Sequence, residues 1–176
     1  MDSPSDYNDA LAIIVAVYAV TIGLTLVFSL AYYVVMSIAL MSFFRKVGVE
    51  PWIAWVPYYN YWKWLEVGGQ PGWYSLLSLT GIGAYVTLVF LYIGMYRTGL
   101  AFGKSGAFLV LGIFLPFVWA FILGGKSEVY RPETLSSFGY PPPLAGHGAV
   151  PMEQRNFHAY QQQQQDQQTP PPYTGA

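Results

Sequence analysis

The sequence predicts an all-α protein, a polytopic membrane helical bundle with three transmembrane helices, an interfacial aromatic-rich helical segment and a disordered C-terminal tail. Of its 176 residues, 54% are hydrophobic and only 10% are charged, whereas soluble domains usually carry about 25% charged residues. Charged residues are also absent from three windows, residues 10–44, 67–96 and 105–125. Because a crossing helix needs about 20 apolar residues, each window is long enough to span a bilayer.

The first predicted span, residues 10–44, is expected to be one helix. Gly23 is its only glycine, and it contains no proline, asparagine or aspartate that would favour the alternative of two shorter spans. At about 1.5 Å per residue, a single helix would be about 52 Å long, whereas the hydrocarbon core is about 30 Å thick. We therefore expect this helix to tilt strongly or to project from the membrane.

One face of this first helix is lined by hydroxyl groups and other mildly polar side chains. Its members recur every three or four residues: Tyr18, Thr21, Thr25, Ser29, Tyr32 and Met36. Small and hydroxyl residues on a membrane helix usually pack against a second helix and hydrogen-bond across it. The sequence therefore predicts a helix-packing face, with a polar pathway through the membrane as the alternative.

Residues 51–67 are predicted to form the interfacial segment. Its aromatic residues are Trp52, Trp55, Tyr58, Tyr59, Tyr61, Trp62 and Trp64. Trp and Tyr favour the headgroup level of a membrane, where the ring is apolar and its N–H or O–H meets water. Pro57 predicts a break between two short helices, and Asn60 is the expected N-cap of the second, while Lys63 is expected to extend toward lipid phosphate. A shallow re-entrant path is the alternative.

The second and third spans are predicted at residues 72–96 and 105–125. Along the second, a seam expected to face the first helix contains Ser78, Gly81, Tyr85, Tyr92 and Tyr96. The third contains Pro116, which lacks a backbone donor and should kink the helix. Between these two spans lies a short polar connection that contains Gly103 and Lys104. The motif residues proposed from sequence are therefore Trp52, Trp55, Pro57, Asn60, Gly103, Lys104 and Pro116.

The composition predicts a membrane domain over residues 10–126 and a disordered, Pro/Gln-rich tail over residues 127–176. This tail contains eight prolines and eight glutamines, so it cannot bury enough apolar surface to offset its chain entropy. Its Pro170-Pro171-Pro172-Tyr173 run matches a proline-rich ligand pattern. We expect the tail to be a contact surface for a protein partner.

Orientation follows from the positive charges, because short loops rich in Lys and Arg remain in the cytoplasm. With three spans, five positive residues share one side: Arg45, Lys46, Lys63, Lys126 and Arg131. Two others, Arg97 and Lys104, fall on the opposite side together with residues 1–9. The sequence thus predicts a multi-pass plasma-membrane protein with an extracytoplasmic N-terminus and a cytoplasmic tail. Residues 1–9 contain no Lys or Arg, unlike the start of a cleaved signal peptide.

No catalytic, cofactor-binding or metal-ligating constellation emerges from the sequence, and we predict no cofactor. The chain has no cysteine, and its two histidines, His147 and His158, lie in the predicted disordered tail, where nothing would fix their geometry. The adjacent Lys104 and Ser105 formally suggest a Ser/Lys hydrolase, but neighbours at a helix start seldom have the required approach. A net charge of −1 gives no reason to expect nucleic acid as a partner.

The ordered motifs resemble a family of small bacterial membrane proteins of unknown function, DUF5684. The motifs that carry this resemblance are Trp52-Ile53-Ala54-Trp55-Val56-Pro57-Tyr58-Tyr59-Asn60, Gly68-Gly69-Gln70-Pro71-Gly72-Trp73, Ala101-Phe102-Gly103-Lys104-Ser105, Phe114-Leu115-Pro116 and Ile122-Leu123-Gly124. They cover roughly residues 45–130. The resemblance implies a bacterial cytoplasmic membrane, and the tail is similar to those of actinobacterial proteins. It implies no activity.

Two functions remain as hypotheses, together with a third that has less support. The leading one is a non-enzymatic component of the lipid bilayer that anchors or assembles a partner, with the interfacial aromatic segment and the tail as contact surfaces. The alternative is a small transport or channel subunit, although transport predicts a charged group at mid-membrane and the spans contain none. An enzyme is third, because a membrane hydrolase would need a positioned base. The sequence does not determine the oligomeric state.

Overall fold

The structure is a computed structural model that describes residues 4–148, with side chains described from residue 7 onward. The described part is all-α, in agreement with the predicted fold class. Its elements are α1 (Pro4–Val47), η1 (Pro51–Trp55), α2 (Tyr59–Val67), η2 (Gly72–Thr80), α3 (Ile82–Ala101), α4 (Phe108–Phe114), α5 (Pro116–Leu123) and η3 (Pro132–Phe138), where η marks a 3₁₀ helix.

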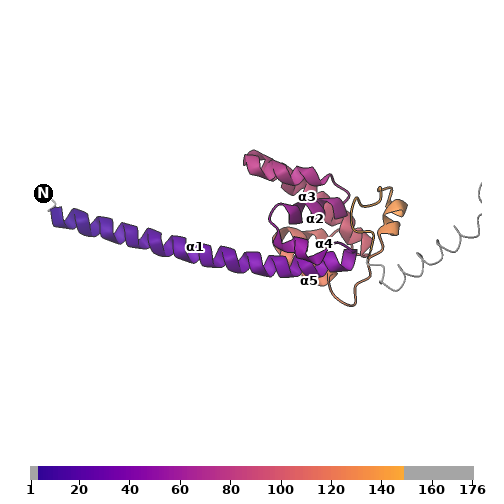
Figure 1. Ribbon diagram of the computed structural model, residues 1–176, viewed down its shortest axis with the longest axis horizontal. Helices are drawn as coiled ribbons and strands as arrows, with labels where there is room; N and C mark the ends of the chain where they lie inside the picture. The colour runs from indigo at the N-terminus through magenta and orange to yellow at the C-terminus, as the bar shows by residue number, and fades with distance from the viewer. Residues whose placement is uncertain (1–3, 149–176) are drawn as a thin grey trace, which may run out of the picture.

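Helix α1 is one uninterrupted helix of 44 residues, which confirms the prediction of a single helix over residues 10–44. Its residues 7–31, which we call the free half of α1, are exposed along their whole length and project from the rest of the molecule (Figure 1). The C-terminal part is embedded, with Ala39, Phe43 and Val47 fully buried. Nothing after its first residue, Pro4, breaks this helix, because residues 5–47 contain neither proline nor a pair of glycines.

The other helices form a compact part made of three helical hairpins that start and end near the C-terminus of α1. In the first hairpin, η1 reaches back along α1, where the Tyr33 hydroxyl donates to the carbonyl of Trp55 at 2.6 Å. In the second, η2 folds onto α3, and the Thr87 hydroxyl donates to the carbonyl of Tyr74 at 2.7 Å. In the third, α4 and α5 fold onto each other and return the chain to Ser42.

Aromatic rings fill the core between these hairpins. Trp119 of α5 lies between Phe43 of α1 and Trp64 of α2, with ring centroids 5.4 and 6.0 Å away. All three side chains are at most 2% exposed. Because such rings carry large buried areas and pair favourably at these distances, they join elements from three distant parts of the sequence.

The second predicted span, residues 72–96, begins too early. Gly81 adopts a positive φ of 71° and separates η2 from α3, so the long helix starts at Ile82. The rings of Tyr74 and Phe90 lie 4.4 Å apart, which shows that η2 folds back beside α3. The predicted seam is found only in part: α3 packs on η2, α2, α4 and η3, while α5 and η1 cover α1, although Tyr92 of the seam lines a cavity together with Tyr32 of α1. Tyr85, a member of that seam, is 74% exposed.

The third predicted span, residues 105–125, is broken rather than kinked. A Cβ atom on Gly112 would lie 3.0 Å from Cδ1 of Trp119, although seven residues of straight helix would separate them by about 10 Å. Pro116 forces this reversal, because it has no N–H and excludes Leu115 from helical geometry. Helices α4 and α5 have 7 and 8 residues, so each is only about 12 Å long or less.

Two helices are long and apolar enough to cross a membrane, judged by length and composition alone. They are Tyr7–Val47 and Ile82–Ala101, so three transmembrane spans are not found among the described residues.

The predicted disorder of residues 127–176 is wrong for residues 127–148, which pack on the compact part. The backbone of Arg131 donates to the carbonyl of Ala101 at 2.9 Å, and Gly148 donates to Val47 at 2.9 Å. Between these two bonds, η3 buries Leu135, which is 3% exposed. A few apolar anchors and backbone bonds suffice to order a segment whose average composition is polar. The Gln-rich part of the predicted tail and His158 lie outside the described residues.

Candidate functional site

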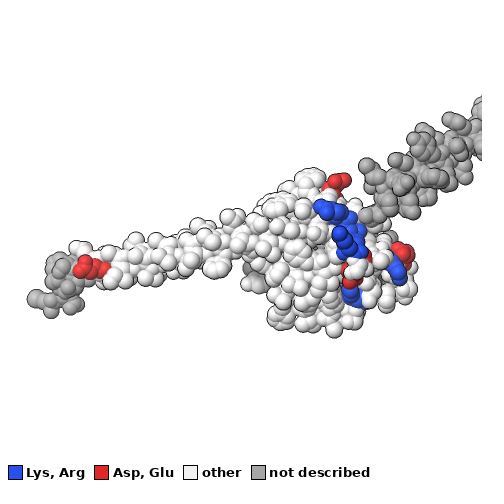
Figure 2. All heavy atoms as spheres, turned by 90° about the horizontal axis from the view of Figure 1, so that it is seen from below, with Lys and Arg blue, Asp and Glu red and all other residues white. Residues whose placement is uncertain are grey.

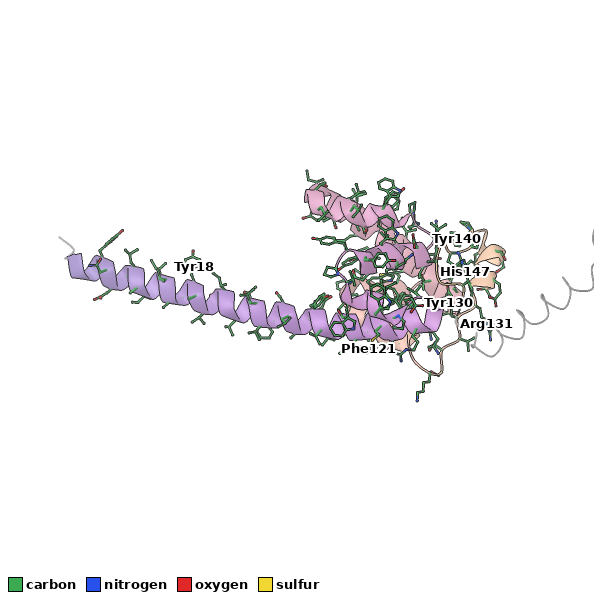
Figure 3. The ribbon with its side chains drawn as sticks, viewed as in Figure 1. Tyr18, Phe121, Tyr130, Arg131, Tyr140 and His147 are labelled. Atoms are coloured by element: carbon green, nitrogen blue, oxygen red, sulfur yellow. The ribbon has the colours of Figure 1, made fainter. Side chains whose placement is uncertain are left out.

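Charged side chains gather at one end of the compact part, away from the free half of α1 (Figure 2). Arg45, Lys46 and Lys126 line one hollow there. Arg97 lies beside Tyr140, Lys104 pairs with Glu128, and Arg131 is labelled at the same end in Figure 3. The predicted separation of Arg97 and Lys104 from Lys126 and Arg131 is therefore wrong. The Lys104 ammonium pairs with the Glu128 carboxylate at 2.7 Å, because hairpins return the connection after α3 to the same end as the tail.

The tail segment completes this charged end. Figure 3 places Tyr130, Arg131, Tyr140 and His147 together there, whereas Tyr18 stands alone on the free half of α1. The Tyr130 hydroxyl donates to the carbonyl of Gly146 at 3.0 Å, and the Arg97 guanidinium lies 4.9 Å from the ring centroid of Tyr140. Burial, followed by the nearby Glu133 carboxylate, raises the pKa of Tyr130. His147 is exposed at this end.

At the opposite end of each hairpin, the turn carries no charge. We call residues 55–58, 79–82 and 114–116 the hairpin tips. Their apolar side chains are strongly exposed, including Leu79 at 62%, Ile82 at 82% and Phe114 at 78%. Large exposed apolar patches are uncommon on soluble monomers and mark surfaces that contact a protein, a ligand or a membrane.

The predicted interfacial segment forms the first of these hairpins, which we call the aromatic hairpin, residues 51–67. Trp52 and Trp55 are 58% and 40% exposed, and Pro57 lies in the turn between η1 and α2. The next residue, Tyr58, has a φ of +62°, an unusual conformation for a residue other than glycine. The Tyr33 bond to Trp55 described above fastens this turn to α1.

Asn60 is not the helix cap that the sequence predicts. Helix α2 starts at Tyr59 with Tyr58 as N-cap, and no side chain caps it. Instead, the Asn60 side chain is 6% exposed and its Nδ2 donates to the carbonyl of Ala54 at 3.3 Å. Asn60 therefore ties η1 to α2, because the turn at Pro57 brings the two elements together.

Glu66 organises the inner end of the aromatic hairpin, and sequence reasoning missed it. Its carboxylate accepts hydrogen bonds from Trp62 Nε1 and Lys63 Nζ, both at 2.7 Å. Its backbone carbonyl accepts the amide of Leu144 at 2.9 Å, so it also fastens the tail segment. Lys63 is thus paired within the helix and does not extend toward lipid phosphate as expected. The i, i+3 spacing of Lys63 and Glu66 was the only available signal.

Gly103 and Lys104 close the C-terminus of α3. Gly103 has a φ of +68° and donates to Leu100, while Lys104 donates to Gly99; together these form a Schellman motif. This geometry requires a residue that tolerates the left-handed region, which explains the glycine at position 103. Since the Lys104 ammonium is held by Glu128, it is not placed to activate Ser105.

A cavity of about 260 Å³ opens between α1, α2, α3 and the α4–α5 turn, and three tyrosines line it. Tyr61 contributes from α2, and burial, followed by the proximity of Tyr32 and Tyr92, raises its pKa. A phenol with a raised pKa stays neutral at physiological pH and has no basic group beside it here. The lining includes Pro116, whose place at the start of α5 sets the turn.

Within residues 4–148 there is no group of three His, Cys, Asp or Glu side chains that could hold a metal ion. The site is an arrangement of apolar hairpin tips and a charged end on an all-α fold, two of whose described helices are long and apolar enough to cross a membrane. Residues 52–131 match the model of a family of unknown function, DUF5684. This match confirms the resemblance of that segment, covers almost all of the three hairpins and leaves α1 outside.

Comparison with curated proteins and with solved structures gives no match.

Proposed function

We propose that this chain is a non-enzymatic membrane component that anchors or assembles a partner. In this proposal α1 crosses the plasma membrane, the N-terminus is extracytoplasmic and the charged end faces the cytoplasm. The observation that carries it is the free half of α1, an apolar stretch with no Lys, Arg, Asp or Glu from residue 10 onward. Residues 10–31 alone form about 33 Å of helix, which is sufficient to cross a hydrocarbon core.

The compact part would then enter the bilayer from its cytoplasmic side without crossing it. From its start to the residue before Arg97, α3 contains no charge over residues 82–96, which corresponds to about 22 Å of helix. This is less than the ~30 Å thickness of the core, so the hairpin tips would end inside the membrane. Backbone polar groups at such depth need hydrogen-bond partners, and in the second turn the Thr80 hydroxyl donates to the carbonyl of Leu77 at 2.8 Å and accepts the amide of Gly83 at 3.2 Å.

The side chains of α1 favour assembly over transport. The hydroxyl of Thr21 donates to the carbonyl of Val17 and that of Thr25 to Thr21, both at 2.8 Å. These donors are satisfied within the helix and do not require a water-filled path. Within the described residues no other segment covers the predicted packing face up to Ser29, so it is available to a helix of a partner.

Photo-crosslinking from two exposed tyrosines tests this proposal. A photoreactive phenylalanine analogue would replace Tyr18, on the free half of α1, and, as a matched control, Tyr85 on α3; the two side chains are 66% and 74% exposed. Irradiation of native membranes should yield a discrete protein adduct from position 18 and none from position 85. If position 18 yields lipid adducts alone, assembly through α1 is wrong. Solute flux through the purified protein in liposomes would favour the transport alternative.

A further inference from the structure

A hollow of about 450 Å³ lies between α1 and α5 at the charged end. We call it the basic hollow; its lining consists of Ser42, Arg45, Lys46, Gly124 and Lys126. Three of its five lining residues are cationic and none is acidic. In the part of the chain that the structure describes, the ion pairs are Lys63–Glu66 and Lys104–Glu128, so no carboxylate there neutralises the hollow.

Close packing of two helices forms the floor of the basic hollow. A Cβ atom on Gly124 would lie 2.8 Å from both the carbonyl carbon and the Cβ of Ser42. Only a glycine permits this approach, which brings Lys126 from the end of α5 close to the last turn of α1. Arg45 and Lys46 in that turn complement the negative end of the helix dipole. That interaction accounts for Arg45 and Lys46 on α1, but not for Lys126, which follows α5.

Apolar side chains continue from the hollow toward the membrane interior. Ile38 lies one turn before Ser42 on α1 and is 39% exposed, while Phe121 lies one turn before Gly124 on α5 and is 41% exposed. Figure 3 shows Phe121 on α5 beside the C-terminal part of α1. The surface is therefore amphipathic, with cations at the level of the headgroups and an apolar flank below them.

We propose that the basic hollow binds the phosphate headgroup of an anionic phospholipid of the cytoplasmic leaflet, with an acyl chain lying along Ile38 and Phe121. Anionic phosphate complements the three cations, and basic pockets between membrane helices on this side suit such headgroups. A free phosphate ion would use the same cations but would gain nothing from the apolar flank. This proposal rests on the membrane placement proposed above.

Native mass spectrometry of the full chain, purified in detergent, tests the proposal. The probes are phosphatidylglycerol, phosphatidylcholine and inorganic phosphate. The test variant is Lys46→Gln/Lys126→Gln, and the control is Lys63→Gln/Arg131→Gln, which removes the same charge outside the hollow. Since each cation near a membrane surface contributes about a fivefold preference, the test variant should lose roughly 25-fold of its preference for phosphatidylglycerol over phosphatidylcholine, and the control should retain it.

Three results would overturn the headgroup site: equal losses in both variants, no loss in the test variant, or displacement of the bound lipid by millimolar inorganic phosphate. Extraction of each variant from membranes with alkaline carbonate is measured in parallel. If the unmodified protein is extracted, the membrane placement itself is wrong. If the test variant remains in the membrane but does not prefer anionic lipid, the placement holds and the site has its predicted chemistry.

Discussion

Gly68 at the end of α2 and Gly94 in the middle of α3 pack backbone against backbone, with no room for a side chain between them. A Cβ atom on Gly68 would overlap Cα of Gly94, and one on Gly94 would lie 3.1 Å from Cα of Gly68. This contact joins the first hairpin to the second and fixes where the aromatic hairpin ends. Both positions therefore require glycine because the two backbones lie too close together for a Cβ atom, and not because of a positive φ.

Replacing Gly68 with Ala should destabilise the protein by about 1–3 kcal/mol, because overpacking forces backbone to shift. Gly94→Ala should cost less, since its contact is longer. The control is Gly23→Ala on the free half of α1, where no atom lies within 4 Å. The free energies of unfolding of the three variants in detergent, measured by circular dichroism, should show that Gly68→Ala is the least stable, followed by Gly94→Ala and then Gly23→Ala. Equal stability of Gly68→Ala and Gly23→Ala would contradict the packing argument.

The Schellman motif at the end of α3 predicts a different kind of glycine effect. Gly103 has open space around it but a φ of +68°, so Gly103→Ala should cost about 1–2 kcal/mol through backbone strain alone. Gly99→Ala is the matched control, because its Cβ would meet only the Phe108 ring at 4.0 Å and alanine favours helix. Thermal unfolding should therefore separate the two variants, and a similar melting temperature for both would rule out strain at Gly103.

The sequence predicted the class of this fold and the continuity of α1, because long charge-free windows and the absence of helix breakers are local properties. It did not predict whether the chain continues or reverses its direction at a helix-breaking residue. Gly81 and Pro116 were visible, but counting apolar residues does not distinguish a helix that continues from a hairpin that returns. Glu66 was missed for a related reason: its backbone partner, Leu144, lies far away in the sequence.

Truncation tests the packed tail segment. A chain that ends after residue 148 retains all the described contacts. Its melting temperature should therefore equal that of the full protein. One that ends after residue 131 loses η3 and the buried Leu135, and should be less stable by about 2 kcal/mol or more. Equal melting temperatures for the two truncated chains would mean that residues 132–148 contribute nothing to the compact part.

Tyr130 predicts a loss of stability at alkaline pH. Burial raises its pKa from the ordinary value of 10.0, so the folded state keeps the proton longer than the unfolded state. Its contribution is therefore fully present below pH 10 and declines as the pH rises above that value. Tyr130→Phe should lose about 1 kcal/mol at neutral pH, through the bond to Gly146, and should show a weaker decline above pH 10. Parallel pH profiles for both proteins would contradict this assignment.

The membrane placement predicts the sidedness of single cysteines, which can be introduced cleanly because the chain contains none. Ser105→Cys, in the connection that follows the Schellman motif, should react with an impermeant maleimide only from the cytoplasmic side. Asn8→Cys should react only from outside. Thr80→Cys, at a hairpin tip, should react from neither side, since it lies within the bilayer.

The three-span arrangement predicted from the sequence makes the opposite prediction for Ser105, because it places the connection between the second and third spans outside together with Asn8. The Lys104–Glu128 ion pair and the backbone bond from Arg131 to Ala101 join that connection to the tail, so the two cannot lie on opposite sides of a membrane while the fold is intact. Labelling of Ser105→Cys from outside would therefore refute the hairpin arrangement. Labelling of Thr80→Cys from outside would mean that the second hairpin crosses the whole bilayer and does not end inside it.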